Sequence, residues 1–191
     1  MKGTRAVHGD LQAVLFETEA ISSRLKELAR DIAKDYAGKS PLLLGVLSGC
    51  FMLISDLSKE LAMLSQDVEV GFIRASSYGG RATMSNGNAI VTGTDSVELR
   101  GRDVILVDDI VDTGHTVVKV LDILKDSGAS SVSVLTLLDK KCRRKANVHI
   151  DYAGFECPDE FVVGYGMDYN EKYRALPYVG ILRPEVFSSA Q

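Results

Sequence analysis

The stretch VILVDDIVDTGHTV, residues 104–117, decides the fold and the place of the candidate site. It begins with the aliphatic run 104–107, which is typical of a strand buried on both faces of a parallel sheet. Acidic residues and a Thr-Gly pair fill 108–116, and from Val117 to about Gly128 apolar residues recur at helical spacing. The segment therefore predicts a buried strand, an acidic turn over 108–116 and a helix.

The sequence on either side repeats this order of strand, turn and helix. The expected elements are a helix over 18–37, strands over 42–47, 68–73 and 131–138, and a helix with an apolar face of Ile54, Leu57, Leu61 and Leu64. Strands that alternate with helices predict an α/β fold, an open and mostly parallel twisted sheet with helices on both faces. Ligands of such folds bind at the carboxyl ends of the strands, where the turns 48–50 and 108–116 lie.

No linker, repeat or low-complexity tract divides the chain, so we expect one domain over 1–191. The segment 76–89 is rich in Gly and small polar residues and has little to bury, which predicts a mobile loop or an excursion between two strands. From 147 to 191 the chain carries aromatic residues and short strand-like pieces, which predict a small cap beside the sheet.

Composition excludes several classes of protein. Twenty-two Lys and Arg against 26 Asp and Glu give a net charge of -4, which argues against a broad nucleic-acid surface. The three cysteines have no CxxC spacing, so neither a disulfide framework nor a zinc site is expected. No run of about 18 apolar residues suggests a membrane span, and the N-terminus does not resemble a signal peptide. We therefore expect a cytoplasmic protein that binds neither membrane nor nucleic acid.

The acidic turn offers two kinds of ligand chemistry. Backbone N–H groups and hydroxyls at 113–116, at the positive end of a helix, suit a phosphate group. Asp108, Asp109 and Asp112 would repel a bare phosphate, but they suit the hydroxyls of a phosphorylated sugar or Mg²⁺. A helix cap alone would explain Asp112 or Thr113, but not two acids directly after a strand. Neither a dinucleotide fingerprint nor a P-loop is present.

The segment 104–117 resembles the phosphoribosyl-pyrophosphate (PRPP) signature of type I phosphoribosyltransferases, which is an apolar strand, two acids, two apolar residues and D-T-G-x-T. LLLGVLSGCFMLISDL (42–57), the Ser-Ser-Tyr-Gly sequence at 76–79 and FVVGYGMDYNEKYR (161–174) extend the resemblance to hypoxanthine-guanine phosphoribosyltransferases over nearly the whole chain. The resemblance implies a Mg²⁺-dependent purine-salvage enzyme that converts PRPP and a 6-oxopurine, hypoxanthine or guanine, into IMP or GMP and pyrophosphate. It also implies a homodimer or homotetramer.

Each role that the resemblance implies falls on a matching residue. Asp108 and Asp109 match the pair that binds the ribose hydroxyls, and Asp112 matches the general base at N7 of the purine. The 5′-phosphate cradle is matched by Asp112, Thr113, Gly114, His115 and Thr116. His115 stands where many relatives carry Lys, so a phosphate contact and a solvated side chain are both open.

Base recognition and pyrophosphate binding are implied for residues outside the signature. Lys140 matches the donor to O6, Phe161 the ring that stacks on the base and Val162 the residue whose main chain reads its edge; the cap over 147–191 would thus bind the base. The other matches are Asp168 as the Mg²⁺ ligand beside base and pyrophosphate, Arg174 as a pyrophosphate cation, and Ser77 and Tyr78 in the closing loop. The remaining basic residues of DKKCRRK (139–145) are interpreted as solvated.

One position departs from the family pattern. Relatives often have Leu-Lys-Gly in the first strand-helix turn, with a leading cis peptide, and this chain has Leu47-Ser48-Gly49. Ser48 and Gly49 keep the backbone role toward pyrophosphate, but Ser48 lacks the charge. Three alternatives stay open: another acceptor such as xanthine or a pyrimidine, a PRPP-fold regulator that senses nucleotides and binds RNA or DNA, and a phospho-acceptor receiver domain.

Overall fold

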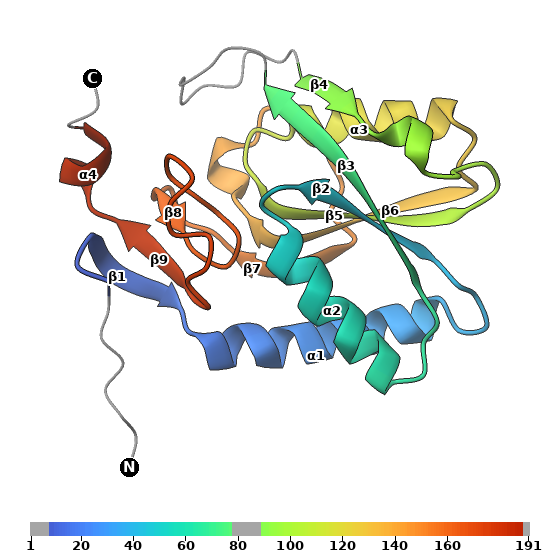
Figure 1. The fold of residues 1–191 in the computed structure, drawn as a ribbon, viewed down its shortest axis with the longest axis horizontal. Coiled ribbons are helices and arrows are strands. Elements are labelled where there is room, and N and C mark those ends of the chain that lie inside the picture. Colours follow the sequence, from blue (N-terminus) through green and yellow to red (C-terminus); the bar gives the residue numbers. More distant parts are fainter. Residues whose placement is uncertain (1–7, 78–88, 189–191) are drawn as a thin grey trace.

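The computed structural model describes residues 8–77 and 89–188, and it places them around two sheets. The larger, six-stranded sheet has the order β4-β3-β2-β5-β6-β7. Its strands are β2 (Leu42–Leu47), β3 (Glu69–Ser77), β4 (Ala89–Thr92), β5 (Asp103–Val111), β6 (Ser131–Asp139) and β7 (Tyr152–Glu156). All neighbours pair in parallel except β3 and β4. This confirms the predicted open, mostly parallel sheet (Figure 1).

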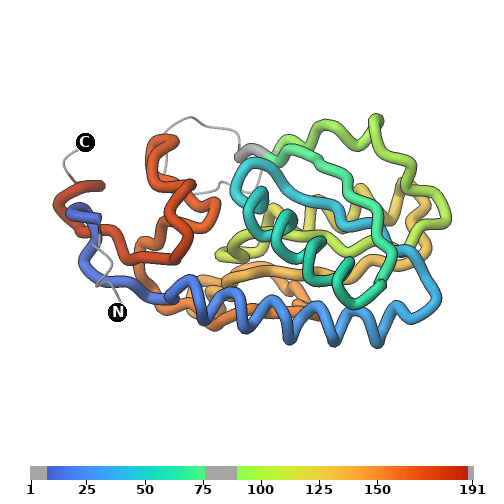
Figure 2. The backbone as a smooth tube through the Cα atoms, turned by 60° about the horizontal axis from the view of Figure 1, so that its bottom comes forward, coloured from blue at the N-terminus to red at the C-terminus, as the bar shows by residue number. Residues whose placement is uncertain are grey.

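Helices cover both faces of this main sheet. The helices are α1 (Thr18–Asp35), α2 (Phe51–Met63) and α3 (His115–Asp126). One core cluster joins the buried faces of α1 and α2 to one side of the sheet, and a second joins α3 to the other side. β2 and β5 lie between these layers, and their buried aliphatic side chains explain the unalternated apolar runs of the sequence. Figure 2 shows α1 running along the sheet toward its far end.

The second, three-stranded sheet forms a hood at one end of the molecule (Figure 1). It has the order β1-β9-β8 and consists of β1 (Leu11–Phe16), β9 (Val179–Leu182) and β8 (Val162–Val163), followed by the short helix α4 (Pro184–Ser188). The predicted cap over 147–191 differs from this hood in two ways. The N-terminal strand β1 belongs to the hood, since it pairs with β9, whereas β7 is an edge strand of the main sheet.

Three element boundaries differ clearly from the sequence prediction, and the first is that of β3, which ends at Ser77 and not at 73. β5 continues to Val111, so Asp108 and Asp109 lie in the strand and the turn begins only at Asp112. The strand is longer than its aliphatic run because the pairing with β6 continues from Asp108 to Val111. α2 ends at Met63, and Leu64 is its exposed C-cap residue; Leu53 joins Ile54, Leu57 and Leu61 on the buried face instead.

The predicted loop over 76–89 lies mostly outside the described residues. Ser77 ends β3 and Ala89 begins β4, and the two strands pair in antiparallel fashion. Residues 78–88, with Tyr78, are not described.

The described residues also include two 3-10 helices, η1 (Thr94–Ser96) and η2 (Lys141–Arg143). Cys50 and Cys157 are buried, Cys142 is exposed, and all three are free thiols. Within 8–77 and 89–188, no helix has the length and apolar character to cross a membrane.

Candidate active site

A cavity of about 740 Å³ lies between the carboxyl ends of the main-sheet strands and the hood. The main sheet and the segment after β6 contribute Asp109, Ile110, Asp112, Lys140 and Arg143; the hood side contributes Glu160, Phe161, Val162, Met167, Asp168, Phe187 and Ser188. Among the residues singled out from the sequence, Asp109, Asp112, Lys140, Phe161, Val162 and Asp168 line this one cavity. Ile110, Met167 and Phe187 were missed because an apolar side chain that lines a cavity has the same sequence pattern as one that fills a core.

Two acids near the carboxyl end of β5 form a pair, in which Asp108 is buried and Asp109 is half-buried. Asp108 is buried, and its Oδ1 accepts a hydrogen bond from the backbone N–H of Asp109 at 3.2 Å. Burial raises the pKa of both carboxyl groups, and the charge of Asp109 raises the pKa of Asp108 further. Arg174 opposes the shift at Asp109. The pair therefore holds negative charge that the protein compensates only in part, which suits a site for sugar hydroxyls or a cation.

Glycine at position 49 lets the chain approach this pair closely. A Cβ on Gly49 would overlap the carboxylate of Asp109, because β2 and β5 are neighbours and end side by side. On the hood side, Gly166 has φ +101 and its α-carbon faces the carbonyl of Gly49, where a Cβ would also overlap. The peptide bond between Leu47 and Ser48 is cis, as the resemblance implied. Gly49 thus joins the acid pair of the main sheet to the hood.

The turn after β5 leads directly into α3. Gly114 is the N-cap residue with φ 86, and the helix begins at His115, so His115 and Thr116 lie in its first turn. A side chain at 114 has no room, since a Cβ there would lie 2.9 Å from Cδ of Arg144. Glycine is thus required both by the left-handed backbone and by packing. The turn offers the helix N-terminus that an anion binds.

Lys140 is a buried cation in the wall of the cavity. Its side chain is 6% exposed, and Nζ donates to the carbonyl of Glu160 at 2.8 Å and pairs with Asp159 at 3.4 Å. A buried ammonium group is costly unless it is paired and hydrogen-bonded. An ammonium group has three N–H donors, and the partners described here are the carbonyl of Glu160 and the largely exposed carboxylate of Asp159. Lys140 can therefore donate to a further acceptor in the cavity.

Aromatic rings form part of the hood wall. Phe161 stacks on Phe187 of α4 with ring centroids 4.9 Å apart and meets Tyr169 edge-on at 5.6 Å. Val162 is buried directly beside it in β8. The flat apolar surface around Phe161 suits a planar ligand, with Phe187 as its support.

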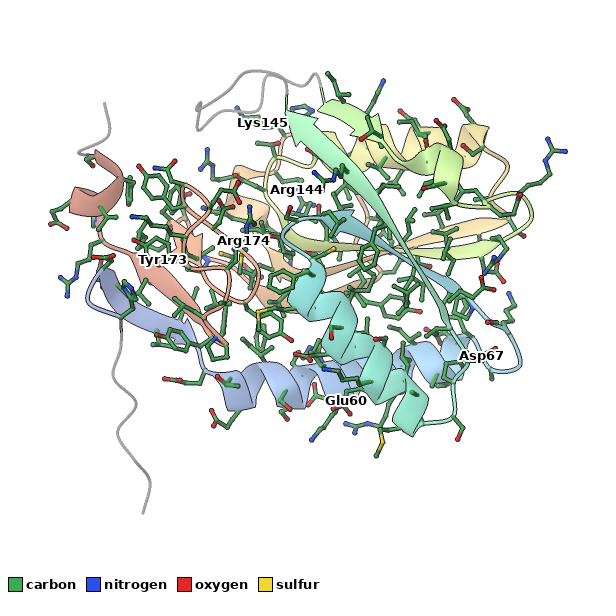
Figure 3. All side chains as sticks on the ribbon, viewed as in Figure 1. Glu60, Asp67, Arg144, Lys145, Tyr173 and Arg174 are labelled. Carbon is green, nitrogen blue, oxygen red and sulfur yellow. The ribbon has the colours of Figure 1, made fainter. Side chains whose placement is uncertain are left out.

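Asp168 and Arg174 pair with each other within the hood. Arg174 contacts Oδ1 of Asp168 at 2.9 Å and also pairs with Glu171, while its NH1 donates to the carbonyl of Gly166. Figure 3 shows Arg174 beside Tyr173 in the loop that precedes β9. No cluster of three or more metal-binding side chains occurs in the part of the chain that the structure describes. Any Mg²⁺ here would take most of its ligands from substrate and water, which is usual for this ion.

The basic run 139–145 is not uniformly solvated, which corrects the sequence interpretation for two residues. Nε of Arg143 lies 3.5 Å from Oδ1 of Asp112, and Arg143 lines the cavity. Arg144 is half-buried and binds Asp139 and the turn after β5. Lys141 and Lys145 are exposed, as expected. The sequence could not separate these residues because all of them follow one another in a short irregular segment.

A parallel sheet that ends in an acid pair and a D-T-G turn, with a hood across the cavity, defines a type I phosphoribosyltransferase fold. The family model for the phosphoribosyl transferase domain matches residues 12–170, and the chain belongs to this family. It is 42% identical over 179 residues to the hypoxanthine-guanine phosphoribosyltransferase of Streptococcus thermophilus, with 94% of this chain and 97% of that protein covered.

Two further relatives define the extent of the similarity. The crystal structure of a hypoxanthine phosphoribosyltransferase from Staphylococcus aureus matches with a TM-score of 0.88 and 39% identity, covering 97% of this chain and 99% of that one. The bifunctional protein TilS/HprT of Listeria monocytogenes is 40% identical over 186 residues, which are 97% of this chain. The chain spans only 28% of the length of that bifunctional protein.

Proposed function

We propose that the protein transfers the 5-phosphoribosyl group of PRPP to N9 of hypoxanthine or guanine, which yields IMP or GMP and pyrophosphate in purine salvage. The observation that carries the proposal is the single cavity that unites a buried ammonium group, an aromatic wall and Asp112 next to the acid pair. A 6-oxopurine offers an acceptor oxygen, a flat ring and an acidic proton to these three features in turn.

Base recognition is assigned to Lys140, Phe161 and Val162. Nζ of Lys140 donates to O6 of the purine, Phe161 stacks on the ring and the main chain of Val162 pairs with the ring edge. Ile110 and Met167 add apolar surface to the same cavity. Adenine carries an amino group instead of O6, so it would place a donor against the ammonium group and is excluded.

Asp112 accepts the proton of N7 while N9 bonds to C1′ of the ribose and the bond from C1′ to pyrophosphate breaks. Among the described residues, none donates a hydrogen bond to Oδ1 of Asp112, although this atom is buried. Arg143 lies near it, but at 3.5 Å and without hydrogen-bond geometry. Oδ1 itself is closed to solvent, but the Asp112 side chain is 38% exposed and lines the cavity, so its other oxygen is the acceptor that a purine N–H reaches.

The acid pair and the turn hold the sugar phosphate. Asp108 and Asp109 accept hydrogen bonds from the ribose hydroxyls and stabilise the positive charge that grows on the sugar as the bond to pyrophosphate breaks. The 5′-phosphate binds the N–H groups and hydroxyls at 113–116, with His115 beside them. Pyrophosphate binds the backbone at Ser48 and Gly49 and the guanidinium of Arg174, which would have to leave Asp168 or Glu171 in part. Ser77 and Tyr78 are assigned to the closing loop.

The residues present fit a magnesium ion. Asp168 presents a carboxylate to the cavity, and the acid pair supplies uncompensated negative charge nearby. When bound, Mg²⁺ would neutralise the charge that develops on pyrophosphate.

We also propose that the protein is a homodimer or homotetramer in the cytoplasm. Large apolar side chains are exposed on α2, β3 and β4, including Phe51, Met63, Phe72 and Ile90, and a subunit contact would cover them. Light scattering on the purified protein tests the oligomeric state.

The experiment that tests the function is a panel of single bases. The protein is incubated with PRPP, Mg²⁺ and hypoxanthine, guanine, xanthine, adenine or uracil, and nucleotide and pyrophosphate are both measured. Turnover of hypoxanthine and guanine with adenine and uracil inert is the expected result. Exclusive turnover of xanthine or of uracil would replace the proposed acceptor, and turnover of no base would overturn the proposal of phosphoribosyl transfer.

A further inference from the structure

Three successive carbonyl groups of the turn after β5 face the same segment of the chain. The carbonyl of Val111 accepts from the guanidinium of Arg144 at 3.1 Å and from the backbone N–H of Lys140 at 3.0 Å. The carbonyl of Asp112 accepts from Nε of Arg144 at 3.0 Å. The carbonyl of Thr113 accepts from the backbone N–H groups of Lys145 and Ala146 at 3.0 and 2.9 Å. Segment 140–146 therefore binds every carbonyl from 111 to 113.

Arg144 is held in this place by a second contact. Its NH2 pairs with Oδ1 of Asp139, the last residue of β6, and the two side chains are only 16% and 6% exposed. The aliphatic part of Arg144 packs against Gly114, where a Cβ would come within 2.9 Å of Cδ. A planar guanidinium that donates to two carbonyls and a carboxylate at once uses a fork geometry that an ammonium group lacks.

The direction of these carbonyls sets the direction of the neighbouring N–H groups. In a planar trans peptide, the C=O of one residue and the N–H of the next point to opposite sides. With the carbonyls of 111–113 turned toward segment 140–146, the N–H groups of Asp112, Thr113 and Gly114 are turned away from it. The proposal places the phosphate on that side, because backbone N–H groups before a helix N-terminus suit an anion.

We propose that Arg144, braced by Asp139, is a positioning residue that holds this turn in the phosphate-binding conformation and sets the carboxylate of Asp112. Arg144 is absent from the lining of the cavity, so it acts through the turn and not by contact with the substrate. The inference deepens the proposed phosphoribosyl transfer and rests on it for the role of Asp112. The orientation of the phosphate-binding N–H groups depends only on the contacts described above.

The matched pair of variants is Arg144→Met and Lys145→Met, which remove the same charge from adjacent residues (Figure 3). Lys145 has an exposed side chain and holds the turn through its backbone N–H, which the substitution keeps. Ribose 5-phosphate is the probe, and calorimetry measures its affinity. Arg144→Met is expected to weaken binding about tenfold or more, the effect of losing hydrogen bonds that order a charged ligand's site. Lys145→Met should stay within about twofold of the parent protein.

Hydrogen exchange and kinetics separate positioning from general instability. In Arg144→Met, amide exchange should accelerate in peptides that cover 111–118 and stay unchanged in α1. The kcat and the KM for PRPP should both worsen, while the KM for the base should change less than about twofold. Arg144→Lys keeps the charge without the fork and should recover only part of the affinity; Asp139→Asn should give a smaller loss in the same direction.

The possible outcomes distinguish the positioning role of Arg144 from the proposed phosphoribosyl transfer. If Arg144→Met, folded by circular dichroism, binds ribose 5-phosphate as Lys145→Met does, the positioning role is wrong. If Arg144→Met does not fold, the same comparison is made with Arg144→Lys, and full affinity in that variant overturns the requirement for the fork. A parent protein that binds ribose 5-phosphate but turns over no base refutes the proposed function and leaves the affinity and exchange measurements decisive for Arg144.

Discussion

The two walls of the cavity hold their polar groups in different ways. On the main-sheet wall, the acid pair, the turn and Lys140 are fixed by strand pairing, by backbone hydrogen bonds and by burial. On the hood wall, Asp168 and Arg174 are partly exposed side chains that pair with each other and with Glu171. Surface ion pairs contribute little stability and exchange partners easily. The acid pair, the turn backbone and Lys140 of the main-sheet wall are thus preorganised. The Asp168–Arg174 pair of the hood wall can change partners when a charged ligand arrives, and the Arg143–Asp112 pair of the main-sheet wall shares this property.

This difference assigns different parts of the reaction to the two walls. Preorganised groups act on charge that develops in the transition state, because they need no rearrangement when the reaction occurs. A group that must first leave an ion pair loses the free energy of that pair when the substrate binds. Such a group therefore affects mainly the affinity for the substrate. We therefore expect substitutions in the main-sheet wall to lower kcat, and substitutions in the hood wall to raise KM values.

The largest effect is expected for Asp112→Asn. The amide keeps the size of the side chain but cannot accept the N7 proton, so kcat should fall by about 10²–10⁴-fold, the usual contribution of a general base. Affinity for IMP or GMP should change far less. Steady-state kinetics and nucleotide titration measure the two quantities. Near-normal turnover would remove the general-base assignment.

Gly49→Ala tests whether the main-sheet wall depends on close packing. A Cβ at this position overlaps the carboxylate of Asp109, which is half-buried in the cavity wall and would have to shift. A displacement of a reacting group by about 1 Å can cost roughly 10²-fold in rate, so kcat/KM for PRPP should fall by about that factor. Gly9→Ala is the control, since a Cβ there meets no atom within 4 Å. Full activity of Gly49→Ala would show that the acid pair tolerates displacement.

How well the sequence predicted each wall follows from how that wall is built. The main-sheet wall comes from one continuous segment in which an unalternated strand, two acids and a D-T-G turn are local signals. β2 and the helices α1 and α3 were predicted to within a few residues for the same reason. The extension of β5 through the acids was missed because the pairing with β6, which is tertiary, overrides the low strand propensity of Asp.

The hood wall depends on contacts between residues far apart in the chain. β1 pairs with β9, and nothing in the sequence near residues 11–16 indicates this partner. Phe187 supports Phe161 from a short helix at the other end of the chain. Arg144 and Lys145 are adjacent and equally basic, yet the side chain of Arg144 binds the turn and that of Lys145 is exposed. The resemblance placed Lys140 where local pattern could not, since a Lys in a basic run gives no sign of burial.

Asp168→Asn tests the hood wall, and a smaller effect on turnover is expected. With Asp168 as the proposed ligand of Mg²⁺, the substitution would remove one carboxylate from the ion, so the KM for PRPP should rise by about tenfold while kcat falls much less. The Mg²⁺ concentration for half-maximal rate should rise in parallel. Glu171→Gln is the matched control: it removes another exposed partner of Arg174 and should change the same values by less than about fivefold. If Asp168→Asn lowers kcat by a larger factor than it raises the KM for PRPP, the two walls do not differ in the way proposed.

The smallest effect is expected for the stability of Asp108→Asn. It tests whether the charge of Asp108 serves the reaction or stabilises the folded protein. Burial and Asp109 raise the pKa of Asp108 in the folded state. The folded protein therefore binds this proton more tightly than the unfolded chain does, and it loses stability as the pH rises from about 4, the unfolded pKa, through the raised folded pKa. Asp108→Asn removes this loss and keeps an acceptor for the N–H of Asp109. At neutral pH we expect a gain of about 1 kcal/mol, or roughly 2–4 °C in Tm, together with weak PRPP binding.

Asp103 at the other end of β5 provides a control of opposite sign. Hydrogen bonds from Ser131 and Lys39 lower its pKa, so its charged form stabilises the fold above the unfolded pKa and this contribution is lost as the pH falls. Asp103→Asn should therefore lower Tm at neutral pH, and the deficit should shrink toward pH 4 just as the gain of Asp108→Asn does. Thermal unfolding of both variants between pH 4 and 8 measures the two trends. A fall in Tm for both at neutral pH would mean that Asp108 contributes to folding, and the preorganised charge of the main-sheet wall would then carry no cost in stability.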